Sequence, residues 1–120
     1  MSFEEELKSI CSSVEGGRSA LVMSRDGISV SVYKVDDQGP DDETMMIEMV
    51  ASLNQAVSAA AASGAAPLTF MELHTAVGTV MINWLSEEYF VALMLNPGAL
   101  DGRARYALRI HSLALEKELL

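Results

Sequence analysis

The sequence has little cysteine, few cations and no long apolar run, and each shortage excludes a class of protein. Its single cysteine, Cys11, cannot form a disulfide within the chain and fits a reducing compartment. Lys and Arg number eight and form no cluster, and the net charge is −9, so nucleic acid and anionic membrane surfaces are poor partners. No apolar run approaches the roughly 20 residues that span a bilayer, and residues 1–6 are acidic where a signal peptide is basic. We therefore expect a cytoplasmic protein that does not insert into membranes.

What the sequence does contain points to one folded domain. Its 120 residues are enough for a sizeable core without disulfides or metals. Apolar residues make up 50% of the chain, which is too many for a disordered protein. No repeat or linker divides the chain, so we predict a single domain over residues 1–120.

No motif for catalysis or for binding a cofactor stands out. The glycines before Arg18 and Ser19 lack the Gly-Lys-Ser/Thr ending of a phosphate loop and lead from a helix into a strand, the reverse of that motif. The acidic stretch at 36–43 lacks the spacing and central glycine of a calcium loop. We interpret His74, His111 and Cys11 as structural residues, and we predict no catalytic residue, no metal site and no cofactor.

A β-hairpin is the clearest local structure. Ile28, Val30 and Val32 alternate with serines, a period of two that is typical of a strand with one buried face. The preceding Asp26-Gly27 pair is a strong turn signal, because glycine adopts positive φ without steric cost. The pattern predicts paired strands over residues 18–24 and 28–33.

The remaining periodicities predict three helices and three further strands. Ser2 and Glu5 form a capping box at the start of the first helix, which ends before Gly16. The other helices are predicted over 42–63 and 100–119, and the strands over 68–74, 79–85 and 89–95. The last strand is apolar throughout, as expected for a central strand covered on both faces. This order predicts an α/β fold, a three-layer α/β/α sandwich around an antiparallel sheet.

The middle helix has more apolar surface than one sheet face requires. Most of its large apolar residues fall within an arc of roughly 140°, which is enough to cover the sheet. A second flank holds Ile47, Ala51, Ser58 and Ala62. Small side chains there would let another helix approach closely, from the same chain or from a second one. Apolar residues at helical spacing are usually ordinary core, but a three-layer domain offers nothing further to cover this flank, so we favour a contact between chains.

The last helix is predicted to be amphipathic. Arg105, Arg109, Ser112 and Glu116 define its polar side on a helical wheel. The apolar side consists of Leu100, Ala104, Ala107, Leu108, Ile110, Ala114 and Leu115.

The order of elements and three stretches of sequence resemble the Roadblock (dynein light chain) family. The stretches are 21–28 around the Asp-Gly turn, the end of the long helix at 62–64, and the strand 89–95 that leads through Asn96-Pro97-Gly98 into the last helix. The resemblance covers nearly the whole chain. It implies a five-stranded antiparallel sheet between the long helix and the two terminal helices.

The resemblance also implies a function without catalysis. Family members are non-enzymatic regulators or scaffolds for small Ras-like GTPases, or light chains of motor complexes. This short, acidic, single-domain chain is most similar to the MglB-type partners of MglA-type GTPases. Those partners act by repositioning residues of the GTPase, and none of Arg18, Arg25, Arg103, Arg105 and Arg109 has an obvious arginine-finger role here. A scaffold or motor light chain with no GTPase-activating role is the alternative.

Family homodimers join the strand after the long helix to its two-fold mate and pair the long helices. For this chain the implied dimer interface consists of Ile47, Ala51, Leu53, Ser58, Leu68, Phe70 and Met71. The surface expected to bind the GTPase in its GTP-bound state consists of Met45, Glu48, Met49, Ser52 and Gln55.

Overall fold

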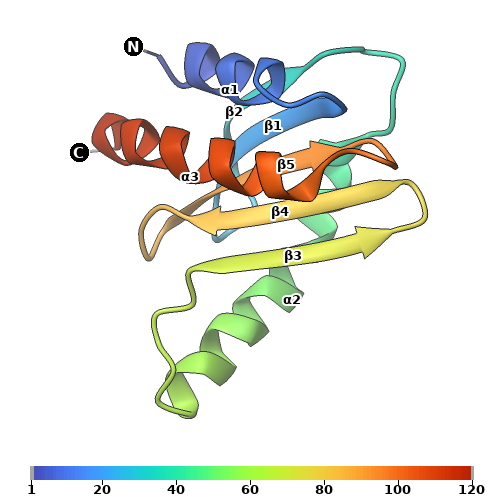
Figure 1. The fold of residues 1–120 in the computed structure, drawn as a ribbon. Helices are drawn as coiled ribbons and strands as arrows, with labels where there is room; N and C mark the ends of the chain where they lie inside the picture. The colour runs from blue at the N-terminus through green and yellow to red at the C-terminus, as the bar shows by residue number, and fades with distance from the viewer. Residues whose placement is uncertain (1, 120) are drawn as a thin grey trace.

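The computed structural model describes residues 2–119 and has the predicted three layers (Figure 1). Its elements run in the order α1 (Phe3–Ser12), β1 (Gly17–Ser24), β2 (Ser29–Lys34), α2 (Asp42–Ala62), β3 (Phe70–Thr75), β4 (Gly78–Trp84), β5 (Tyr89–Leu95) and α3 (Asp101–Glu118). The strands form one antiparallel sheet with the spatial order β2-β1-β5-β4-β3. The predicted α/β/α sandwich and five-stranded sheet are confirmed.

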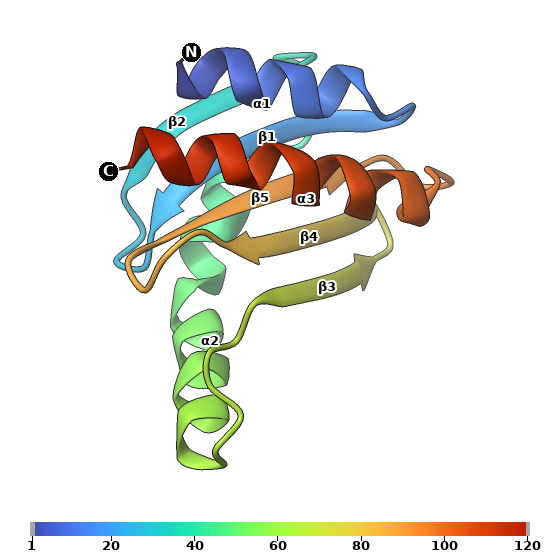
Figure 2. The ribbon, with the colours of Figure 1, turned by 60° about the vertical axis from the view of Figure 1, so that its left-hand side comes forward.

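The two faces of the sheet are covered by different helices. α1 and α3 lie side by side on one face, whereas α2 crosses the other face alone and extends beyond β3 (Figures 1 and 2). β5 is the central strand, and six of its seven residues are buried, as its unbroken apolar sequence predicts. β2 and β3 are the edge strands.

Local signals in the sequence explain where several elements begin and turn. The Ser2 hydroxyl accepts a hydrogen bond from the Glu5 backbone N–H and caps α1, as the capping box predicts. Gly27 has φ +85° in the β1–β2 turn, so the Asp-Gly hairpin is also confirmed. Gly78, at the start of β4, is required by close packing, because a Cβ there would lie 1.9 Å from the carbonyl oxygen of Leu95.

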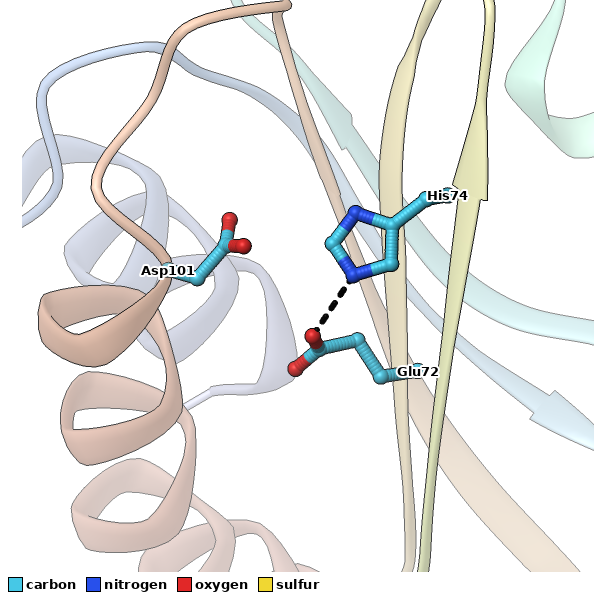
Figure 3. A group of neighbouring side chains, drawn as sticks. All are labelled: Glu72, His74 and Asp101. Atoms are coloured by element: carbon cyan, nitrogen blue, oxygen red, sulfur yellow. Dashed lines mark hydrogen bonds and ion pairs between the residues drawn. The ribbon is translucent and has the colours of Figure 1, made fainter.

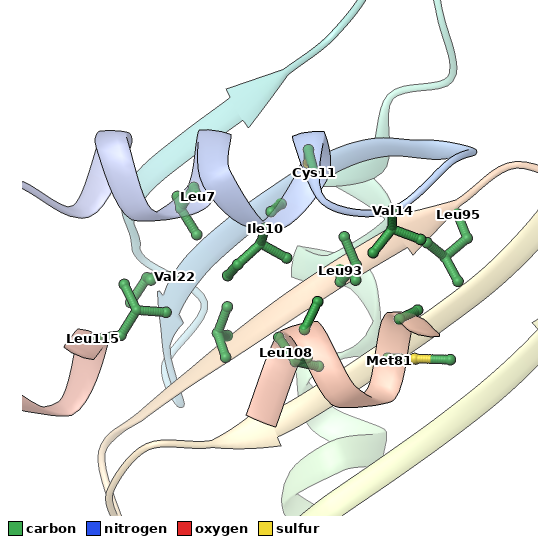
Figure 4. Packing of buried hydrophobic residues seen from close by; sticks show 14 of the residues in the cluster. Leu7, Ile10, Cys11, Val14, Val22, Met81, Leu93, Leu95, Leu108 and Leu115 are labelled. Carbon is green, nitrogen blue, oxygen red and sulfur yellow. The ribbon is translucent and has the colours of Figure 1, made fainter. Parts of the chain in front are cut away.

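The α1/α3 face is a dense apolar core. Leu7 and Ile10 of α1 and Leu108 and Leu115 of α3 are fully buried against Val22, Val91, Leu93 and other strand residues (Figure 4). Cys11 lies in this core, and burial raises the pKa of its thiol to about 12. Its burial agrees with the interpretation of Cys11 as a structural residue.

The predicted faces of α3 are partly wrong. Ser112 was placed on the polar side, but it is buried, where its hydroxyl donates to the Leu108 carbonyl and accepts from the Asn83 amide of β4. Conversely, Leu100 and Ile110 were placed on the apolar side and are 64% and 46% exposed. A hydroxyl that bonds back to its own helix can be buried at little cost, and a wheel of residue types does not detect this.

Two strands also differ from their predictions. β3 begins at Phe70 and not at Leu68, which lies in the connection from α2. Ile28 and Val30 were predicted on a buried face, but they are 66% and 42% exposed at the β2 edge of the sheet. No helix within residues 2–119 has the length and apolar character needed to cross a membrane.

Candidate interaction surface

α2 is fixed to the sheet at its N-terminal end by a buried ion pair. Arg18 of β1 donates from Nη2 and Nε to the two carboxylate oxygens of Asp42 at 2.9 and 3.0 Å, and the Ser19 hydroxyl also donates to this carboxylate. The two charged side chains are only 11% and 5% exposed. Arg18 also donates to the Val77 carbonyl. These contacts hold Arg18 within the fold, so it is not free to reach the active site of a partner.

Beyond that anchor, α2 buries very little apolar surface. Among its 21 residues, Met46 and Leu53 are the only apolar side chains that are buried. Leu53 was predicted in the dimer interface, and this is wrong, because the side chain is 1% exposed and packs in the core under its own sheet. Ala51 and Ser58 are exposed on the outer flank. A helix with so many apolar residues usually has its apolar flank covered by another element or by another chain. The outer side of α2 is therefore a candidate contact surface.

Ile47 belongs to a different part of this surface from the residues near β3. It is 46% exposed, and its Cγ2 lies 4.0 Å from the position that a Cβ on Gly27 would occupy, beside the β1–β2 turn. Ser58 lies three turns further along the helix, about 16 Å away at 1.5 Å per residue. The exposed residues Ile28 and Val30 follow the same turn, so the apolar surface at this end of α2 is larger than the sequence indicated.

β3 gives the surface an unpaired strand edge. It pairs with β4 on one side and with no strand of this sheet on the other. Phe70 and Met71 are half-buried and belong to opposite faces of the sheet, Phe70 with the α1/α3 core and Met71 with the α2 core. The two side chains therefore cannot belong to one apolar patch, and what the two residues share is the free edge of the strand. The backbone N–H and C=O groups of this edge can pair with another strand.

A hollow of about 500 Å³ joins the C-terminal half of α2 to the connection before β3. Val57 and Ala61 line one side of it, Pro67 and Leu68 another, and Trp84 of β4 lies in its wall. The indole N–H of Trp84 is buried without a hydrogen-bond partner within the described chain. Val57, Ala61 and Trp84 were not among the predicted interface residues. The only available signal was the single tryptophan of the sequence, at the end of a largely apolar strand.

The five residues predicted to bind a GTPase divide into two kinds. Met45 and Met49 are half-buried at the margin of the α2 core. Glu48, Ser52 and Gln55 are exposed on the side of α2 that faces away from the sheet. The structure therefore leaves a polar strip available, with the two methionines at its border.

Glu72, His74 and Asp101 bring three possible cation ligands within 4.8 Å of one another (Figure 3). The His74 Nε2 lies 2.8 Å from the Glu72 carboxylate, and Arg105 donates to both oxygens of that carboxylate at 2.7 and 3.0 Å. The Arg105 guanidinium, followed by the His74 hydrogen bond, lowers the pKa of Glu72. Since a guanidinium already neutralises this carboxylate, the group is best explained as an ion-pair network that ties β3 to α3.

His111, the second histidine, has a structural contact of its own. Its Nδ1 lies 2.9 Å from the carboxylate of Glu6, which is buried between α1 and α3. His74 lies on β3 and His111 on α3, and within residues 2–119 the two histidines do not belong to a common cluster of possible metal ligands.

The fold and its surface can be compared with known proteins. No protein-family model matches the chain, and no curated protein matches it in sequence. Among solved structures, MglC from Myxococcus xanthus is 28% identical, with a TM-score of 0.72 over 98% of this chain and 99% of that chain. A Roadblock/LC7 domain from Streptomyces avermitilis is 15% identical, with a TM-score of 0.84 over 99% of this chain and 98% of that one.

The gliding protein MglB from Thermus thermophilus is 17% identical, with a TM-score of 0.82 over 94% of this chain and 84% of that chain. Identities this low show the fold alone, whereas the MglC match adds sequence identity along the full length. The predicted resemblance is thus confirmed: the chain has the fold of Roadblock/LC7 domains and is similar over nearly its whole length to the MglB and MglC structures.

Proposed function

We propose that this protein is a non-enzymatic regulator of a small Ras-like GTPase and acts in the cytoplasm as a homodimer joined through α2 and β3. One observation carries the proposal: α2 leaves its outer flank uncovered, and a hollow at its C-terminal half borders the connection that leads into the free edge strand β3. A two-fold axis beside β3 would pair two strand edges and bring two α2 helices together. Each chain would then cover the surface that the other leaves open.

The structural relatives support the choice of a GTPase as partner. The MglB and MglC structures have this fold over nearly the whole chain, and the sequence resemblance to MglB-type proteins implies an MglA-type GTPase as partner. The exposed strip of Glu48, Ser52 and Gln55 is the proposed contact, with Met45 and Met49 adding apolar area at its border. A net charge of −9 favours a basic patch on the GTPase, so association should slow as salt rises.

The dimer is tested by sedimentation equilibrium of the full chain at micromolar concentration. Ala51→Glu and Ser58→Glu place charges on the outer flank of α2, and each is expected to shift the population toward monomer by about tenfold or more in dissociation constant. Ser9→Glu is the matched control, because Ser9 is exposed on α1, on the other face of the sheet. A strictly monomeric wild-type protein contradicts the proposal.

The GTPase role is tested with an MglA-type GTPase from the same organism, loaded with GTP, GDP or a non-hydrolysable GTP analogue. The protein should bind the GTP forms preferentially and change the rate of hydrolysis. Glu48→Lys should weaken binding, whereas Glu4→Lys on the exposed side of α1 should not. Binding that ignores the nucleotide would favour the scaffold alternative, in which the free β3 edge pairs with another Roadblock chain or a peptide strand.

Arginine variants test whether the chain contributes a catalytic group to the GTPase. Arg25→Ala, Arg103→Ala, Arg105→Ala and Arg109→Ala should each retain stimulation far better than the loss of 10³-fold or more expected for an arginine finger. Arg18 is unsuitable for this test, because its removal would leave Asp42 buried without a counter-ion. Loss of stimulation with intact binding in any one variant would show that the chain is catalytic.

A further inference from the structure

The outer side of α3 has an exposed apolar stripe that the fold does not use. Tyr106, Ile110 and Leu113 are 68%, 46% and 62% exposed. Their spacing of four and three residues places them on one side of the helix, opposite the side that packs on the sheet. Large apolar side chains arranged in this way are typical of a surface that contacts another protein.

A depression beside the stripe makes the surface concave. It has a volume of about 450 Å³ and lies between the start of α3 and the C-terminal end of α1. Tyr106 and Ile110 line it together with the small residues Gly102, Ala107 and Ser13. This lining of small and apolar residues would let the depression receive an apolar side chain from a partner helix.

The charge around the stripe is opposite to that of the molecule. α3 holds four of the eight Lys and Arg residues and three acidic residues, so its net charge is +1, whereas the whole chain has a net charge of −9. Arg105 is neutralised by Glu72, but Arg103, Arg109 and Lys117 are exposed and make no ion pair with a carboxylate of the described chain. On a helical wheel Arg103 and Arg109 lie on the two sides of the stripe, and Lys117 continues its line toward the end of the helix.

We propose that the outer side of α3 binds an amphipathic helix of another protein, one with an apolar ridge flanked by acidic residues. The apolar stripe and the depression supply the contact area, and the three cations select the acidic flanks. An acidic partner would be repelled by most of this molecule, so the cations also determine where it docks. α3 and α2 cover opposite faces of the sheet, so this site and the proposed GTPase contact can be occupied together (Figure 2).

The charge of the whole molecule makes two other occupants less favourable. An anionic membrane would attract the α3 cations but repel a chain with net charge −9. A second copy of this chain docked through the same stripe would bring Tyr106, Ile110 and Leu113 together, but it would also bring together two sets of basic flanks. Both occupants are distinguishable outcomes of the experiment below.

The probe is a fluorescein-labelled synthetic helical peptide with leucines at positions i, i+3, i+4 and i+7 and glutamates on both flanks. The control peptide has lysines in place of the glutamates. In fluorescence anisotropy with the full-length chain, the acidic peptide should bind at least about tenfold more tightly than the basic one, and its affinity should fall as salt rises. Equal affinity for the two peptides, or no binding of the acidic one, would overturn the proposal.

Variants locate the binding on α3. In Gly102→Met the new side chain would enter open space, because a Cβ at this position meets no atom within 4 Å. Methionine also has a higher helix propensity than glycine, so the variant should fold as well as the wild type. It should fill the depression and weaken peptide binding about tenfold. Arg109→Glu and Tyr106→Ser should do the same, whereas Lys8→Glu on α1 should have little effect. Variants that bind like the wild type would contradict the site.

Two further measurements identify the other occupants. Self-association that Tyr106→Ser removes and Ala51→Glu does not would make the stripe an interface between copies. Co-sedimentation with phosphatidylserine vesicles that depends on Arg109 would make it a membrane contact. Either result overturns the proposal of an acidic protein partner and leaves the proposed α2/β3 dimer unaffected.

Discussion

The two faces of the sheet are covered in different ways. On one face, α1 and α3 pack side by side and bury leucine, isoleucine and valine side chains in a continuous core. On the other face, α2 has 21 residues, but Met46 and Leu53 are its only fully buried apolar side chains, and the Arg18–Asp42 ion pair fixes one end of the helix. One face is therefore completed within the chain, whereas the other is anchored at one end and left open along its flank. An apolar side chain on the outer flank of α2 is not covered by its own domain and therefore indicates a binding partner. An apolar side chain of α3 that faces the core is already covered and indicates none.

Cysteine labelling should show the contrast between the faces most strongly. Cys11 lies in the α1/α3 core with a pKa of about 12, whereas Ser52→Cys would place a thiol on the exposed polar strip of α2 with a pKa of about 8.5. At about pH 8 the two thiolate fractions differ on the order of 10³-fold. Iodoacetamide should therefore modify the introduced cysteine in the native protein and Cys11 only after unfolding, as measured by mass spectrometry. Rapid native labelling of Cys11 would show that the α1/α3 face opens readily.

Breaking the anchor of α2 should have the next largest effect. Arg18→Met keeps the length of the side chain but leaves the Asp42 carboxylate buried without a cation, which costs about 3–5 kcal/mol in the free energy of unfolding. Urea unfolding followed by circular dichroism measures it. The double variant Arg18→Met, Asp42→Leu should recover most of this loss, since neither charge remains. An Arg18→Met protein as stable as the wild type would mean that the ion pair does not anchor α2.

A matched pair of truncations compares the helices directly. Leu108→Ala removes a fully buried side chain of α3 and should lower the free energy of unfolding by about 2–5 kcal/mol. Ile47→Ala on α2 removes a side chain that is 46% exposed, and the loss should stay below about 1 kcal/mol at low protein concentration. If the Ile47 region is covered in a dimer, the loss of unfolding free energy caused by Ile47→Ala should become larger as the protein concentration rises. Similar losses for the two variants would contradict the contrast between the faces.

The smallest effect is expected from the ion-pair network between β3 and α3. Arg105 lowers the pKa of Glu72 in the folded protein, so the pair stabilises the fold above the unfolded pKa of about 4.3 and this contribution is lost as pH falls through the lower folded pKa. Glu72→Gln should therefore destabilise the protein slightly near neutral pH, and this difference should disappear as pH falls below the folded pKa of Glu72. Solvent exposure of Arg105 keeps the difference small. A difference in urea midpoint that grows as pH falls would have the wrong sign.

The sequence predicted the architecture because the signals for it are local. The Asp-Gly turn, the Ser2 cap and the apolar β5 each specify their own element from neighbouring residues, and all of them are confirmed. The order of these elements then leaves few ways to build a sheet with helices on both faces.

The errors concern contacts between residues far apart in the chain. Ser112 is buried because Asn83, from another element, satisfies its hydroxyl, and no helical wheel contains that information. Leu53 was assigned to an interface, although the angle at which α2 crosses the sheet turns it inward. The Arg18–Asp42 anchor joins residues that are 24 positions apart, so neither residue alone indicated it. The proposed dimer and partner surfaces remain predictions, because they depend on a second molecule.

The free edge of β3 has a consequence for how this protein could diversify. Hydrogen bonds along a strand edge involve only the backbone, so they do not distinguish an identical chain from a related one. If the gene duplicated, both products would keep a compatible strand edge. The side chains of α2 would then determine whether a chain pairs with an identical chain or with its duplicate. Changes confined to Ala51, Ser58 and their neighbours, which are exposed and make little contribution to the core, could then convert a self-pairing protein into one half of a mixed pair without altering its fold.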